Sequence, residues 1–293
     1  MKVVVTGSHG MLAQDLLPRL ENTGINVIGL DLPEINITQK RETFHVLKAE
    51  NPSLLINCAA YTSVDKAESE HSAAFAVNYD GAAILAEACH RLNIHLLHIS
   101  TDYVFNGYSK LRYREEDPAD PLSIYGRSKW EGEEAIRIRQ SEHIIVRTAW
   151  LFGVHGSNFV KTMLRLARER EELRVVDDQI GCPTWSGDLA EALVKIVFFL
   201  RDRDNFRQWG TYHFCGMGRT TWYGFACAIL EEARKYEPLT VKKITPIATN
   251  QYPTPAPRPA LSVLDTEKIN RVFGIKPMYW RQSLNKMLKE LYQ

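Results

Sequence analysis

The chain has 293 residues, of which 45% are hydrophobic and 24% are charged, and its formal net charge is +1. This length allows one large globular domain or two ordinary ones, each with a well-buried core. The balanced charge leaves no electrostatic footprint for nucleic acid or an anionic membrane, so neither is predicted as a partner. No apolar run reaches the length of a membrane span and no signal peptide precedes the first strand, which predicts a cytoplasmic protein.

The cysteines give no sign of a metal site or a disulfide framework. Their number is odd, they are widely spread and none forms a CxxC pair. We expect reduced core residues at all five positions, Cys58, Cys89, Cys182, Cys215 and Cys227.

The first half of the chain alternates short apolar runs, rich in β-branched residues, with longer amphipathic segments. Strands are predicted at residues 2–7, 25–31, 53–60 and 94–101, and helices at 11–24, 40–50 and 73–93. Near-continuous apolar strands separated by helices are typical of a parallel sheet that is covered on both faces. The predicted fold class is therefore α/β, with a doubly wound, Rossmann-type parallel sheet.

This regularity weakens after the apolar segment at residues 143–153. Helices are predicted at 158–171 and 186–202 and a strand at 173–177, while the proline-rich stretch 252–260 predicts an ordered loop before helical pattern resumes at 265–274. We expect a dinucleotide-binding domain over residues 1–153, to which segments at about 185–215 return. Residues 154–293 are expected to form mainly a smaller substrate-binding region.

A small-residue turn links the first predicted strand to the first predicted helix. Gly7, Gly10 and Ala13 give it the spacing GxxGxxA, which lets backbone N–H groups approach a pyrophosphate at the positive end of a helix. The spacing departs from the GxGxxG fingerprint, so a simple structural turn remains an alternative. Asp31 ends the second strand, where it would accept hydrogen bonds from an adenosine ribose or merely form a turn. No cation follows it to hold a 2′-phosphate, which favours NADH over NADPH.

Tyr125 and Lys129 stand four residues apart at the start of a predicted helix, so they would share one face. A free tyrosine has a pKa near 10, and a neighbouring ammonium would lower it toward neutrality while also binding the nicotinamide ribose. Thr101, at the end of the fourth strand, would orient a substrate oxygen toward the phenol. An isolated YxxxK is more often a solvated helix face. The nucleotide-type turn and the strand end that precede it favour catalysis.

Six stretches together resemble the extended short-chain dehydrogenase/reductases, and within them the branch that reduces dTDP-4-dehydrorhamnose. They are the TGxxGxxA turn, STDYVFNG, YGRSKWEGE, VRTAWLFG, NFVKTM and DQIGCPT, and the likeness extends over nearly the whole chain. The resemblance implies reduction of the 4-keto group of dTDP-4-dehydro-β-L-rhamnose by NADH or NADPH. A homodimer is left open as its assembly.

The resemblance also implies roles for individual residues. The catalytic residues would be Thr101, Tyr125 and Lys129. The cofactor would be bound by Gly7, His9, Gly10, Met11, Leu12, Asp31, Asn36, Ile37, Ala60, Tyr61, Thr62, Tyr125 and Lys129. The sugar would be bound by Thr101, Asp102, Tyr103 and Trp150.

Two departures from the family pattern bear on these roles. Asn36 and Ile37 stand where relatives commonly carry an Asp-hydrophobic pair near the adenine, so that contact is expected to be weaker. Arg258 could meet the nucleotide diphosphate or cap a surface loop, and it is left out of the predicted site.

Other functions remain open. One is a non-catalytic homologue such as the regulatory β subunit of methionine adenosyltransferase, against which the intact triad argues. Another is a nucleotide-sugar epimerase or dehydratase, or a different nucleotide-sugar reductase. Dehydratases generally carry Asp-Glu after the threonine of the strand end, whereas here Asp102 and Tyr103 follow Thr101, which favours simple reduction.

Overall fold

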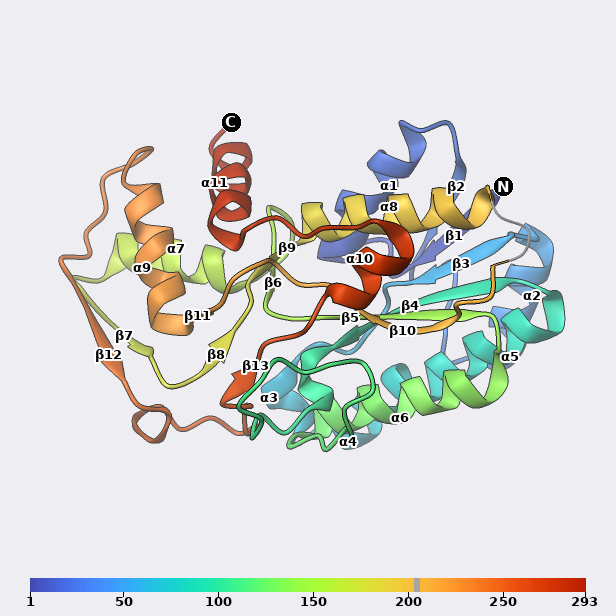
Figure 1. Cartoon of the computed structure of the whole chain (residues 1–293), viewed down its shortest axis with the longest axis horizontal. Helices are drawn as coiled ribbons and strands as arrows, with labels where there is room; N and C mark the ends of the chain where they lie inside the picture. The colour runs from blue at the N-terminus through green and yellow to red at the C-terminus, as the bar shows by residue number, and fades with distance from the viewer. Residues whose placement is uncertain (203–205) are drawn as a thin grey trace.

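A computed structural model, which describes residues 1–202 and 206–293, has a six-stranded parallel sheet at its centre (Figure 1). The strand order is β10-β5-β4-β3-β1-β2, and every neighbouring pair is parallel. The strands are β1 (Lys2–Thr6), β2 (Asn26–Leu30), β3 (Leu54–Asn57), β4 (His95–Thr101), β5 (His143–Thr148) and β10 (Gly210–His213). The order reverses between β1 and β3, which is the point where open α/β sheets bind ligands.

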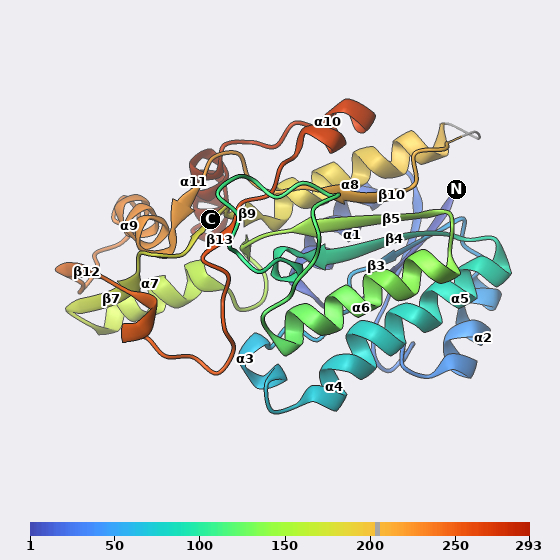
Figure 2. The same cartoon turned by 60° about the horizontal axis from the view of Figure 1, so that its bottom comes forward.

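Helices cover both faces of the sheet, which confirms the doubly wound fold (Figure 2). One face carries α1 (Met11–Glu21) and α8 (Ser186–Arg201), and the other carries α2 (Lys40–Glu50), α5 (Ala82–Leu92) and α6 (Ile124–Arg139). Side chains alternate between the two faces along each strand. Val3 and Val5 therefore pack toward α1 and α8, while Val4 packs toward α2 and α5.

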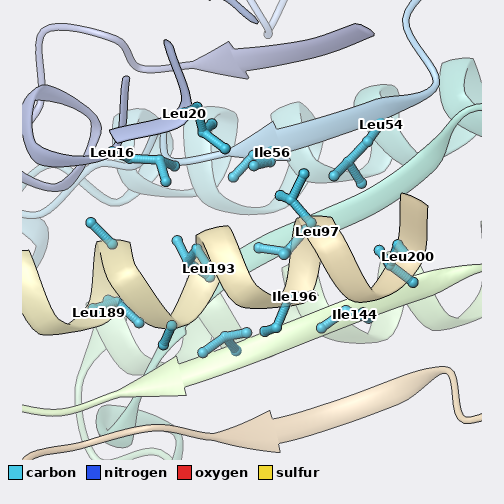
Figure 3. Packing of buried hydrophobic residues seen from close by; sticks show 14 of the residues in the cluster. Leu16, Leu20, Leu54, Ile56, Leu97, Ile144, Leu189, Leu193, Ile196 and Leu200 are labelled. Carbon is cyan, nitrogen blue, oxygen red and sulfur yellow. The ribbon is translucent and has the colours of Figure 1, made fainter. Parts of the chain in front are cut away.

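The larger of these two cores shows why a late segment returns to the first half of the chain. Leu189, Leu193, Ile196 and Leu200 recur at helical spacing along α8, and they pack against Leu97 of β4 and other strand residues (Figure 3). Strand β10 then pairs with β5, and α10 (Glu267–Phe273) packs beside β10 and α8. Burial of this apolar face of α8 thus brings residues 186–201 onto the six-stranded sheet.

A second lobe lies beside the sheet, at the left of Figure 1. Its helices are α7 (Phe159–Glu169), α9 (Trp222–Ala233) and α11 (Trp280–Leu291), and its longest strands, β7 (Glu172–Val176) and β12 (Lys243–Ile247), pair in parallel. Shorter strands form two further small sheets, ordered β11-β8-β13 and β6-β9: β6 (Leu151–Phe152), β8 (Ile180–Gly181), β9 (Thr184–Trp185), β11 (Thr220–Thr221) and β13 (Leu261–Ser262). The lobe has its own core, in which α7, α9 and α11 bury aromatic and aliphatic residues.

The helix predicted at residues 73–93 has an unpredicted irregularity. It consists of α4 (His71–Phe75), a π-helical stretch η1 (Ala76–Gly81) and α5. Within η1 the side chain of Asn78 accepts a hydrogen bond from the N–H of Tyr61 and donates to its carbonyl and to the hydroxyl of Ser128. Stretches of π-helix recur at functional sites, and this one ties the loop after β3 to α6.

Three short helical segments complete the chain: α3 (Val64–Ala67), η2 (Asp102–Val104) and η3 (Thr249–Gln251). All five cysteines are free, and three of them, Cys89, Cys182 and Cys215, are buried. Over residues 1–202 and 206–293, no helix combines the length and the apolar character that a bilayer crossing needs.

Candidate active site

The turn between β1 and α1 requires glycine at its first position. Gly7 has φ +71°, and a Cβ there would lie 2.6 Å from the backbone nitrogen of Ala59, two residues after β3. Gly10 is the N-cap residue of α1 and has no side chain that could accept a hydrogen bond. The N-cap side chain therefore does not occupy the first N–H groups of the helix. A close backbone turn with N–H groups at a helix N-terminus suits a pyrophosphate.

A cavity of about 280 Å³ opens beside this turn, between the carboxyl ends of β1, β2 and β3. Its wall is mainly apolar and includes one carboxylate, as expected of a pocket for an adenosine. Six of the predicted cofactor residues meet on this wall: Gly7, Gly10, Asp31, Asn36, Ile37 and Ala60. The chain around the cavity therefore fits the adenosine half of a nicotinamide dinucleotide.

Asp31 has a structural contact as well as an open side. Its carboxylate accepts hydrogen bonds from the N–H of His9 at 3.0 Å and the N–H of Leu32 at 2.9 Å. The side chain is still 27% exposed, and it lines the cavity. Asp31 can therefore stabilise the turn and still accept a hydrogen bond from a ribose hydroxyl.

The remaining predicted cofactor residues, apart from the catalytic pair, lie outside the cavity wall. His9 is largely exposed, and Met11 begins α1. The Leu12 side chain is buried in the core, so only its backbone can approach a ligand. The Tyr61 hydroxyl donates to Glu70 at 2.6 Å, and Thr62 lies on the exposed loop that follows.

Two of the predicted catalytic side chains, Thr101 and Tyr125, converge because α6 begins directly against the loop after β4. A Cβ on Gly126 would lie 2.2 Å from the carbonyl oxygen of Tyr103, so glycine permits this contact. Ser123 caps α6 by accepting a hydrogen bond from the N–H of Gly126 at 3.1 Å. As a result the hydroxyls of Tyr125 and Thr101 come within hydrogen-bonding reach of each other.

The predicted lowering of the tyrosine pKa by its lysine neighbour is wrong for this geometry. Burial raises the pKa of Tyr125 to about 12, and the hydrogen bond with Thr101 opposes that rise only in part. The amine of Lys129 points elsewhere: its Nζ donates to the carbonyl of Ile99 at 2.7 Å and lies 3.2 Å from Nε2 of His98. Tyr125 is therefore a protonated phenol at neutral pH.

Lys129 is itself an unusual group, because only 2% of it is exposed. Burial lowers its pKa to about 8, against the opposing influence of Glu133 and Cys58. A buried lysine that titrates close to neutrality is typical of functional sites.

A larger cleft of about 830 Å³ lies between the second lobe and the loop after β4. Residues of α7, β7, the start of α9 and the loop 251–258 line it together with Tyr103, whose ring packs edge-on against that of Tyr125 at 5.5 Å. The wall combines apolar and aromatic side chains with three arginines, Arg170, Arg174 and Arg258. Guanidinium groups suit phosphate oxygens, so the cleft fits a nucleotide diphosphate carrying a sugar.

The predicted sugar residues occupy different parts of this region. Asp102 is 2% exposed, and burial raises its pKa to about 6 against hydrogen bonds from Ser262 and Thr101. Trp150 adopts φ +46°, and its ring stacks on Trp222 at 3.5 Å. Of these two indoles it is Trp222 that lines the cleft.

Several residues of the site were not predicted. Arg258, which sequence reasoning left out, lines the cleft while both its terminal nitrogens pair with Asp65 at 2.8–3.0 Å. Beneath the triad lie Asn57 and His98, both about 1% exposed. The sequence did hold a signal for these two residues, because each is a polar residue inside an otherwise apolar strand. Buried polar groups need specific hydrogen-bond partners.

Comparison with known proteins places this geometry in context. The model of the RmlD substrate binding domain matches residues 1–293. The chain is 46% identical to a dTDP-4-dehydrorhamnose reductase of Aggregatibacter actinomycetemcomitans over 97% of each chain. It is 43% identical to the spore coat polysaccharide biosynthesis protein SpsK of Bacillus subtilis, over 99% of this chain and 97% of that one. The structure of a Bacillus anthracis dTDP-4-dehydrorhamnose reductase in complex with NADP is 35% identical, with a TM-score of 0.91 over 99% of both chains.

Proposed function

Because the chain belongs to the RmlD substrate binding domain family, with dTDP-4-dehydrorhamnose reductases among its relatives, we propose that it reduces the 4-keto group of dTDP-4-dehydro-β-L-rhamnose with NAD(P)H. The product is dTDP-L-rhamnose. In this proposal Tyr125 gives the proton that the reduced oxygen requires.

The position of Tyr125 against the cleft wall, on the same helix as Lys129, carries the proposal. Toward the cleft, Tyr125 packs against Tyr103, which lines the wall of that cleft. Toward the cofactor side, Lys129 lies close enough to Cys58 for each to influence the pKa of the other, and Cys58 lines the cavity beside Gly7. A phenol in this place can serve a sugar held in the cleft while a dinucleotide fills the other cavity.

The protonation state of each residue fits reduction. When bound, the nicotinamide supplies the hydride. Tyr125, whose pKa is about 12, holds its proton at neutral pH and can donate it to the negative charge that develops on the substrate oxygen. The Thr101 hydroxyl, within reach of the phenol, can orient that oxygen.

An NADH oxidation assay with enzymatically prepared dTDP-4-dehydrorhamnose tests the proposal. We expect one NADH to be consumed for each sugar reduced. Normal NADH binding with no oxidation would instead support the non-catalytic alternative. Sugar conversion without net NADH consumption would point to an epimerase.

We also propose that NADH is preferred over NADPH. Asp31 lines the cavity as a carboxylate, which can accept hydrogen bonds from ribose hydroxyls and would repel a 2′-phosphate. Asp31→Ala should therefore raise the KM for NADH by roughly 10- to 100-fold, since hydrogen bonds to charged groups contribute about 1.5–3 kcal/mol. The KM for NADPH should change much less. Initial rates with each cofactor give the comparison.

Two variants make that comparison specific. Asp31→Asn retains an acceptor for the N–H of His9, so it separates the loss of charge from the loss of the turn contact. Glu34→Ala removes an exposed carboxylate three residues along and should leave both KM values unchanged. An equal rise for NADH and NADPH in Asp31→Ala would remove Asp31 from the ribose site.

A further inference from the structure

Asp65 joins the loop after β3 to the loop 251–258, which lines the cleft. It belongs to α3 and follows Thr62, the last residue of the predicted cofactor loop, by three positions. Its Oδ1 accepts from the N–H of Ala256 at 3.2 Å and from Nη1 of Arg258 at 3.0 Å, and its Oδ2 accepts from Nη2 of Arg258 at 2.8 Å. Both carboxylate oxygens therefore hold the loop 251–258.

The contacts of Arg258 leave one edge of its guanidinium group open. Nη1 has two hydrogens and three acceptors around it, which are Asp65, the hydroxyl of Thr254 at 2.6 Å and the carbonyl of Ala256 at 2.8 Å. One hydrogen of Nη2 is donated to Asp65. The second hydrogen of Nη2 and the Nε–H meet no acceptor among the described residues. These two N–H groups are parallel on one edge of the planar group, an arrangement that binds a phosphate at two points.

The open edge belongs to a residue of the cleft wall. Arg258, Asp65 and Thr254 all line the cleft, and the Arg258 side chain is 22% exposed. Tyr103 lies close to the ion pair: burial is the main cause that raises the pKa of its phenol, and the charges of Arg258 and Asp65 act on it as well. Because the Tyr103 ring packs against that of Tyr125 at 5.5 Å, the ion pair lies near the proposed proton donor.

Arg258 differs from the other two arginines of the cleft in being held. Arg170 and Arg174 are exposed, and their guanidinium groups donate to no acceptor in the described part of the chain. Each of them would lose side-chain freedom on binding a phosphate, whereas Arg258 is already fixed. The cleft thus has one guanidinium group whose orientation is set before a ligand arrives.

The charge of Asp65 does not by itself favour an anionic ligand. Hydrogen bonds from Arg258 lower the pKa of Asp65, so its carboxylate is charged at neutral pH. A negative charge in the cleft wall repels a diphosphate and offsets part of the attraction of Arg258. Asp65 can therefore favour such a ligand only by orienting Arg258.

We propose that Asp65 is a positioning residue for the nucleotide sugar, which holds one edge of the Arg258 guanidinium group so that the Nε–Nη2 edge is presented to the diphosphate. This inference rests on the proposed function, from which the nucleotide diphosphate is taken. Asp65 acts on the ligand through Arg258. Because α3 follows the predicted cofactor loop, the same contact fixes the loop 251–258 relative to the domain that would hold the cofactor.

Binding of dTDP to the full chain, measured by isothermal titration calorimetry, tests the proposal without catalysis. Asp65→Asn keeps the size of the side chain and an acceptor for Ala256, but its NH₂ group cannot accept from Arg258. We expect the Kd for dTDP to rise about tenfold, because Arg258 is no longer fixed. The Kd for thymidine, which has no phosphate, should stay the same in an NMR titration. A Kd for dTDP that is unchanged or lower would overturn the proposal, since removal of a mere counter-charge tightens binding.

A double-mutant cycle shows whether Asp65 acts through Arg258. Arg258→Lys keeps the positive charge and removes the two-point edge, so it should raise the Kd for dTDP by about tenfold or more. In that background Asp65→Asn should add less than about twofold. Effects that multiply would overturn the proposal. Arg174→Lys is the matched control, the same change at an arginine of the cleft that is not held, and should raise the Kd by less than about threefold. Equal effects at the two arginines would also overturn the proposal.

The Kd for NADH separates these effects from a loss of structure, and it should agree between the wild type and each variant within about twofold. If Asp65→Asn does not fold, Thr254→Val decides instead, because it removes another acceptor of Arg258. We then expect a Kd for dTDP about threefold higher, and an unchanged value would overturn the proposal.

The inference and the proposed function can fail separately. A wild type that binds dTDP but reduces no dTDP-4-dehydrorhamnose would contradict the proposed function alone. A wild type that reduces the sugar, with no change of Kd in Asp65→Asn, would contradict the role of Asp65 alone. A wild type that binds no dTDP would overturn the role of Asp65 together with the assigned ligand.

Discussion

Tyr125→Phe should lower the kcat for reduction of dTDP-4-dehydrorhamnose by about 10³-fold, within the range of roughly 10²–10⁴ that proton transfer by a positioned side chain contributes. The variant loses only the hydroxyl, so the ring can keep its edge-on contact with Tyr103. No other phenol is in hydrogen-bonding contact with Thr101 among the described residues, and the proton would have to come from solvent. Steady-state rates with saturating NADH measure the effect.

The binding of NADH separates this result from a loss of structure. Fluorescence titration should give Kd values for Tyr125→Phe and the wild type that agree within about threefold. Tyr108→Phe is the matched control, since Tyr108 is 75% exposed and should retain full activity. A Tyr125→Phe variant with wild-type kcat would show that another group supplies the proton.

The second large effect is expected on stability, at the buried ion pair between α6 and β5. Glu133 is fully buried, and its two carboxylate oxygens accept from Arg147 at 2.9 Å and 2.7 Å. Arg137 donates to the same carboxylate at 2.7 Å. Glu133→Leu leaves the guanidinium of Arg147 buried without a counter-charge, so we expect the free energy of unfolding to fall by about 3–5 kcal/mol. Urea unfolding measures it.

The effect of Glu133→Leu should also depend on pH. Burial alone would raise the pKa of Glu133, but the charge and hydrogen bonds of Arg147, with Arg137, lower it to about 2. A carboxylate with a lowered pKa in the folded state stabilises the protein above its unfolded pKa of about 4.3, and that contribution is lost as the pH falls toward 2. The difference between wild type and variant should therefore be constant from pH 6 to pH 8 and shrink below about pH 4.

An exposed ion pair gives the control for this prediction. Glu169 pairs with Arg165 across one turn of α7, and both side chains are more than half exposed. Because solvent screens such pairs, Glu169→Leu should hardly change the unfolding midpoint. Equal losses in the two variants would mean that the buried pair contributes no more than a surface one.

The sheet and the placement of Tyr125 and Lys129 on one helix could be predicted from the sequence because both follow from local patterns. Strands β1 to β5 are short apolar runs, and the spacing of Tyr125 and Lys129 fixes them on one helix face. The sequence analysis predicted that a segment at about residues 185–215, which includes α8, returns to the first domain. Its partner face on α1 depends on contacts between residues far apart in the chain, which no local pattern specifies.

Other features were missed because they arise only from tertiary packing. The π-helical stretch at Ala76–Gly81 is read from the sequence as ordinary helix, and only the contacts of Asn78 with Tyr61 and Ser128 distinguish it. The pKa of Tyr125 was predicted in the wrong direction, since spacing along a helix reveals a neighbour but not the depth of burial. The short strands β8, β11 and β13 have two residues each, too few for a period to be visible.

The fate of one hydrogen tests the central claim most directly. We expect NADH that carries deuterium at both positions of nicotinamide C4, incubated with the enzyme and dTDP-4-dehydrorhamnose, to yield dTDP-L-rhamnose with one deuterium on C4 of the sugar, as read by NMR and mass spectrometry. Deuterium at another carbon, or a product without deuterium, would contradict direct reduction of the 4-keto group.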